Sequence, residues 1–148
     1  SGAPYEQIAT IVQANLADIG IDVTLEPMET ATLKSTCVDG KQELFLWRWN
    51  EDSKVDFVYR DLFYTGSGSN YHHYSDSKAD EMIDIVATEK DQDKRLETAK
   101  ELQTYLVDAC PQVPLYIANL VVAYNKNLQG QYFYGGGNHD WRHAYIAE

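Results

Sequence analysis

Apolar side chains near the start of the chain recur first with a helical period and then with a strand period. Between Pro4 and Gly20 they are spaced three and four residues apart, at Ile8, Ile11, Val12, Leu16 and Ile19. This spacing predicts an amphipathic helix that the proline begins and the glycine ends. Apolar and polar residues then alternate over 21–26 and stop at Pro27, which predicts a strand buried on one side. A helix followed directly by a strand is typical of an α/β fold.

The stretch from Glu43 to Trp49, ELFLWRW, is the centre of the predicted fold. It carries large apolar side chains at both odd and even positions, so a strand formed here is apolar on both faces. Such a strand is expected inside a sheet that is covered on both sides. The polar turn formers of 50–54 follow at once. Because open α/β sheets usually bind ligands beyond the carboxyl ends of their strands, we expect ligand contacts at this edge.

The rest of the chain continues the alternation of elements. Helical spacing or caps predict helices over 29–39 and 55–63, from Asp76 or Ser77 to about Val86, and from Asp91 to Pro111. The segments 113–117 and 121–124 have the composition of short strands. A loop is expected over 64–74, and an irregular tail from Gln129 onward. No repeat or linker divides the 148 residues, so the pattern predicts one domain, a mixed sheet flanked by helices.

Charge and composition exclude several function classes. The net charge is −11, with 12 basic residues among 23 acidic ones, and phosphate backbones bind to clusters of Lys and Arg. Nucleic acid is therefore not an expected partner. No apolar run approaches the roughly twenty residues that a membrane span requires. Any secretion signal or lipid anchor is expected to lie outside this chain.

The chain contains no recognisable catalytic or metal motif, so we expect no enzyme, no cofactor and no metal site. CxxC, HExxH, GxSxG and GxGxxG are all absent from the sequence. His72-His73 suggests a metal site, but two nitrogens alone are an incomplete set of ligands. Glu51 and Asp52 suggest a hydrolase pair, but adjacent residues rarely face one substrate. Cys37 and Cys110 pair only if the fold brings them together; the alternative is two small buried side chains.

Several motifs, in this order, resemble the carboxyl-terminal part of the family 5 extracellular solute-binding proteins, the receptors of dipeptide, oligopeptide and nickel ABC importers. They are IATIVQANLADIGIDVTLEP at 8–27, LWRWNEDSKVDFVYRDLF at 46–63, NYHHYSDSKADEMID at 70–84, the run from Asp91 to Gly130, and WRHAY at 141–145. The resemblance implies a receptor with two lobes that close over the ligand. It implies that residues 1–148 are one domain, most of the carboxyl-terminal lobe of a periplasmic-binding-protein-like (type II) α/β fold.

The resemblance also implies where a ligand binds. In the peptide-binding branch, the strand that matches Leu44 to Trp49 presents its backbone to the peptide, and a carboxylate three residues after the final Trp pairs with the ligand's ammonium. Asp52 has that spacing, and a charge-assisted hydrogen bond suits this role. The expected ligand-binding residues are Trp47, Arg48, Trp49, Asn50, Asp52, Asn70 and Tyr71. Trp49 is the better ligand-facing candidate, since Trp47 also suits the core. Asp56 stands where many members have proline, which leaves the turn and the ligand class open.

The function that the resemblance implies is the receptor component of an ABC importer, located outside the cytoplasm as a cell-surface lipoprotein or a periplasmic protein. Its expected partners are a peptide or another small solute, the membrane permease subunits, and the companion lobe of the same receptor. Oligosaccharides and nickel complexes are alternative ligands. The family's sensor relatives offer another alternative, in which the same lobe senses a ligand for a transcriptional regulator.

Overall fold

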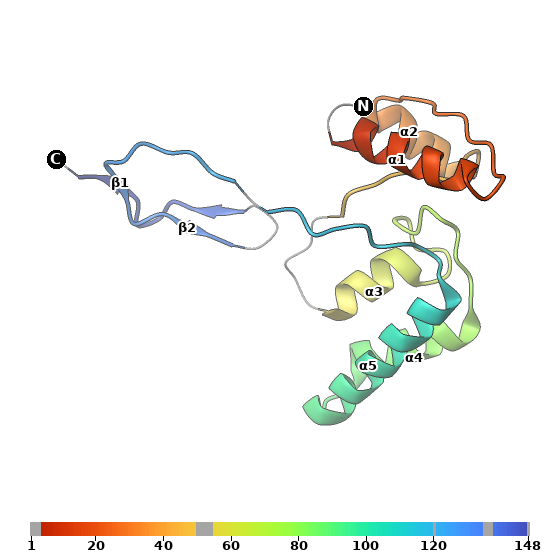
Figure 1. Cartoon of the computed structure of the whole chain (residues 1–148). Coiled ribbons are helices and arrows are strands. Elements are labelled where there is room, and N and C mark those ends of the chain that lie inside the picture. The colour runs from red at the N-terminus through yellow and green to blue at the C-terminus, as the bar shows by residue number, and fades with distance from the viewer. Residues whose placement is uncertain (1–3, 50–54, 120, 135–137, 148) are drawn as a thin grey trace.

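The computed structural model describes residues 4–49, 55–119, 121–134 and 138–147, which form three groups of elements (Figure 1). Helices α1 (Tyr5–Ala17) and α2 (Thr30–Val38) lie together near the amino terminus. Helices α3 (Val55–Phe63), α4 (Ser77–Thr88) and α5 (Gln92–Ala109) form a second group. The predicted helices are thus confirmed, most to within one or two residues at each end.

The buried core lies among α3, α4 and α5, which together with the loop before α4 form the helical unit (residues 55–110). It consists of Phe63, Ala79, Ile83, Val86, Ala99, Leu102 and Leu106. Phe63 belongs to α3, and the other six lie on the apolar faces of α4 and α5, so burying these faces against each other holds the helices together. Each of the two helices also begins at a predicted cap, since the Asp76 and Asp91 carboxylates accept hydrogen bonds from two backbone N–H groups apiece.

Helix α1 keeps its apolar face only partly covered. None of its residues is buried, and Ile11 and the nearby Ile19 are exposed. The segment that follows is tied to the helix by Gln13, whose Nε2 donates a hydrogen bond to the carbonyl oxygen of Val23 at 2.7 Å. That segment is extended, but it is not paired as a strand with any described residue. The predicted strand over 21–26 is therefore not observed.

The other predicted strands are also not observed among the described residues, and neither is the mixed sheet. Residues 43–49, 113–117 and 121–124 form no ladder. A strand is held by hydrogen bonds to a neighbouring strand, and no described segment forms such bonds with these three. The sequence of a segment can show that it suits a sheet, but it does not show which other segment will pair with it.

The described strands lie instead in the tail, where we predicted irregular structure. Strand β1 (Leu128–Gln129) pairs antiparallel with β4 (Tyr145–Ile146), and β2 (Tyr132–Phe133) pairs antiparallel with β3 (His139–Asp140). Figure 1 shows these pairs at the far end of the molecule from the helices. We call residues 111–147, which lead to them and include them, the carboxyl-terminal arm.

The accessible surface is large for a chain of this mass. It measures 11172 Å², whereas a compact monomer of 16.8 kDa exposes about 7,700 Å². Much of the excess is apolar, with Ile117 97% and Val121 88% exposed in the arm. The chain therefore presents apolar surface of the kind that marks a contact with a partner. None of the described helices is long and apolar enough to cross a membrane.

Candidate ligand-binding rim

Two of the predicted site residues, Trp47 and Tyr71, lie against each other. Their ring centroids are 5.3 Å apart and the planes meet at 70°, an edge-to-face contact. Gln42 fixes the backbone beside the pair, because its Nε2 donates to the carbonyl oxygen of Tyr71 at 3.1 Å. The Lys34 ammonium lies 6.0 Å from the centre of the Tyr71 ring. The 43–49 segment and the loop before α4 thus meet in one half-buried aromatic wall.

Trp49 brings a hydrogen-bond donor to the end of the same segment. Its side chain is half-buried, and its indole Nε1 is shielded from solvent yet has no hydrogen-bond partner among the described residues. Leaving a buried donor unpaired costs about 1–3 kcal/mol, so this N–H can gain from an acceptor supplied by a ligand or by another part of the protein. The neighbouring Arg48 is exposed. Asn50 and Asp52 lie outside the described residues, and their predicted roles stay predictions.

Asn70 is buried inside its own loop, with 5% of its surface exposed. Its Nδ2 donates to the carbonyl oxygens of Tyr64 at 3.1 Å and Tyr74 at 2.7 Å, and its Oδ1 accepts from the backbone N–H of Tyr74 at 3.0 Å. The side chain therefore closes the loop that carries Tyr71. Sequence reasoning missed this positioning role, although an asparagine among glycines and serines is a known signal for side-chain bonds to nearby backbone.

The two adjacent histidines face different neighbours. The His72 ring stacks on Phe63 at 5.6 Å, whereas Nε2 of His73 is hydrogen-bonded to the carbonyl oxygen of Cys37 at 2.8 Å. Burial lowers the pKa of His72, and neighbouring His73 lowers it further. In the described part of the chain, no group of three or more His, Cys, Asp or Glu side chains can hold a metal ion. Cys37 is buried, Cys110 is exposed, and both are free thiols.

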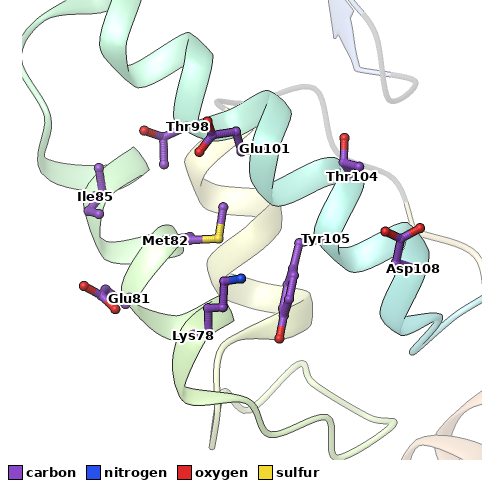
Figure 2. Close-up of a pocket in the computed structure, with 9 residues that line it drawn as sticks. All are labelled: Lys78, Glu81, Met82, Ile85, Thr98, Glu101, Thr104, Tyr105 and Asp108. Carbon is purple, nitrogen blue, oxygen red and sulfur yellow. The ribbon is translucent and has the colours of Figure 1, made fainter.

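Two hollows are present in the helical part of the molecule. One, of about 320 Å³, lies beside the rim and is lined by the 65–75 loop, including Tyr71 and His73, and by Val38 of α2. The other, of about 570 Å³, is an open groove between α4 and α5 that contains none of the predicted site residues (Figure 2). The first hollow shares Tyr71 with the Trp47–Tyr71 wall, so it is the one that can extend the ligand-binding rim, by which we mean this wall and Trp49.

Two comparisons find known proteins that are similar to this chain, one with a family and one with single proteins. Residues 1–71 match the family described as bacterial extracellular solute-binding proteins, family 5 Middle. The probable D,D-dipeptide-binding periplasmic protein DdpA of Escherichia coli is 25% identical over 87% of this chain and 26% of its own length. The probable ABC transporter periplasmic-binding protein SapA of E. coli is 26% identical over 93% of this chain and 26% of its own. The di/tripeptide-binding protein 2 of Pseudomonas aeruginosa is 27% identical over 87% of this chain and 25% of its own.

The chain is therefore similar to the family 5 extracellular solute-binding proteins, the family that its motifs resemble. Members of this family have a periplasmic-binding-protein-like fold, act outside the cytoplasm, and are transport receptors rather than enzymes. The chain spans about a quarter of the length of the relatives that it matches.

Proposed function

We propose that this chain is most of the carboxyl-terminal lobe of a two-lobed receptor, type II in its fold, that captures peptides and delivers them to the permease of an ABC importer. The names of relatives from two genera refer to the binding of dipeptides or tripeptides. The observation that carries the proposal is the rim itself, where the Trp47–Tyr71 wall lies next to a buried, unpaired indole N–H three residues before Asp52.

The rim suits an extended peptide. In the proposed complex, the backbone of 44–49 forms hydrogen bonds with the peptide backbone, which gives affinity without reading the peptide's sequence. These backbone groups are available because 44–49 is not paired as a strand with any described residue. The Asp52 carboxylate binds the terminal ammonium, and Trp49 supplies a donor for a peptide carbonyl.

The companion lobe is proposed to complete both the cleft and the fold. Residues 113–119 and 121–124 are extended and mostly exposed, and their N–H and C=O groups form no backbone hydrogen bond with a described residue. Apolar residues such as Leu115 and Ile117 lie open to solvent there. A lobe that pairs with this segment satisfies its backbone and buries its side chains. The chain alone therefore presents half a cleft, and we expect it to bind peptides weakly.

The test replaces Asp52 by Asn in the complete receptor and measures binding of the same peptides with free and with acetylated amino termini by calorimetry. Removing the negative charge is expected to weaken free peptides by about tenfold or more, because a charge-assisted hydrogen bond is lost. Acetylated peptides, which carry no ammonium, are expected to change by less than about twofold.

Asp56→Asn is the matched control, since it makes the same chemical change four positions further along the chain. Equal losses for both kinds of peptide would remove Asp52 from the proposed role. If the unaltered receptor binds no peptide, the peptide proposal fails, and oligosaccharides and nickel complexes become the ligands to test.

A further inference from the structure

The groove between α4 and α5 has an apolar floor. Figure 2 shows Met82 and Ile85 of α4 on one side and Tyr105 of α5 on the other. Ile85 is 40% exposed, so an apolar side chain that enters the groove finds carbon to contact. The volume of about 570 Å³ accommodates several side chains.

The groove is built on the most firmly packed part of the chain. Ile83 of α4 and Leu102 of α5, the two helices that line the groove, are both fully buried. The Tyr105 hydroxyl donates to Oδ2 of Asp76 at 2.8 Å, and the Lys78 ammonium lies 4.6 Å from the centre of the Tyr105 ring. Because these contacts hold the ring in place, a partner meets a preformed wall and loses less conformational entropy on binding.

The side chains along the edges of the α4–α5 groove are mainly acidic. Its lining includes the carboxylates of Glu81, Glu101 and Asp108, and none of the three forms an ion pair with a described residue. Lys78, the one basic lining residue, is engaged with Tyr105. Glu101 and Asp108 are seven positions apart on α5, which is two helical turns or about 10 Å along the axis.

We propose that this groove binds an amphipathic helix of a partner protein, one that carries Arg or Lys at two positions seven residues apart and an aliphatic side chain between them. The two cations meet Glu101 and Asp108, whose spacing they reproduce, and the aliphatic side chain enters between Met82 and Tyr105. Complementary charge also steers a basic segment toward a chain with a net charge of −11. This docking site is separate from the ligand-binding rim and goes beyond the proposed function.

The probe is an alanine-based helical peptide with two arginines seven positions apart and a leucine between them, acetylated and amidated at its ends. Because the probe has no free ammonium, it does not test the role proposed for Asp52. Titration into the 148-residue chain, followed by calorimetry, is expected to show saturable binding. Glu101→Gln should weaken that binding by about three- to fivefold, as expected for one partly exposed ion pair.

Two controls separate docking from general attraction to an acidic protein. Glu97→Gln makes the same change one turn earlier on α5, at an exposed residue that does not line the groove; it should leave affinity unchanged. A peptide of identical composition with its arginines adjacent should bind more weakly. The proposal is overturned if the chain does not bind the probe, if both substitutions weaken binding equally, or if both peptides bind equally. Circular dichroism of each variant confirms that the helices are intact.

Discussion

The helical unit and the carboxyl-terminal arm are neighbours in sequence, yet among the residues that the structure describes only the first contains a buried core. In the helical unit, Ile83 and Leu102 are fully buried, while in the arm Ile117 and Val121 are almost fully exposed. The arm is not poorer in apolar residues. The difference is that α4 and α5 are joined by a short connection and pack their apolar stripes against each other, whereas residues 113–119 and 121–124 of the arm pair with no strand among the described residues.

This contrast shows what each kind of element requires. A helix satisfies its own backbone and needs a partner only for one face. A strand needs a partner for its backbone as well as for its side chains. The helices of this chain can therefore form from local sequence, while a segment such as 113–117 becomes a strand only where a neighbouring strand is available.

The largest expected effect tests the core directly. Leu102→Ala removes a fully buried side chain and is expected to lower the free energy of unfolding of the helical unit by about 2–5 kcal/mol. Ile117→Ala removes a side chain of similar size that is 97% exposed, and its effect should stay within about 0.5 kcal/mol. Urea unfolding followed by circular dichroism measures both. Comparable losses would mean that the arm is packed in solution.

The loop before α4 offers a second, smaller test. Asn70→Asp keeps the shape of the side chain but places an oxygen where Nδ2 donates to the carbonyls of Tyr64 and Tyr74. We expect destabilisation by about 1–3 kcal/mol, because the part-buried carbonyl of Tyr74 loses its side-chain donor and that of Tyr64 keeps only the N–H of Ser67. Hydrogen exchange of the loop amides reports the change, with Ser69→Ala as the neighbouring control. If loop protection is unaltered by Asn70→Asp, Asn70 does not hold the loop closed.

The smallest expected effect is on how stability depends on pH. Since burial lowers the pKa of His72 in the folded chain below its ordinary value of 6.5, the unfolded chain binds the proton more tightly. The contribution of His72 to stability is therefore complete above pH 6.5 and decreases as the pH falls below it. His72→Phe keeps an aromatic ring on Phe63 without a titrating group, so it should reduce the loss of stability between about pH 7.5 and pH 5. The urea midpoint of each protein is measured at both pH values. If the midpoint of His72→Phe falls as much as that of the unaltered chain, the prediction is wrong.

The same contrast explains which sequence predictions succeed. The helices follow from three-and-four spacing and from caps such as Asp76 and Asp91, which are local signals. The predicted strand over 43–49 is not observed, because its pairing is non-local, and the short strands of the tail have too few residues to show a period.

For the candidate site, the resemblance named Trp47 and Tyr71, and the structure brings them into contact. No periodicity relates two residues that are so far apart in sequence. Asn70 is different, because its type and its surroundings already favour bonds to nearby backbone. Its role in closing the loop was therefore accessible from the sequence, while the aromatic wall required a family pattern or a structure.

The open backbone of the arm has a consequence for handling the chain. From Ala109 to Asn125 there is no charged residue, and Pro114 is the main interruption in a stretch of high β-propensity. Natural edge strands usually carry lysines or other charges that prevent pairing between molecules. Here the net charge of −11 makes separate copies repel each other, and salt screens that repulsion. Concentrated solutions of this chain should therefore aggregate sooner at high ionic strength. Ile117→Lys should delay this aggregation.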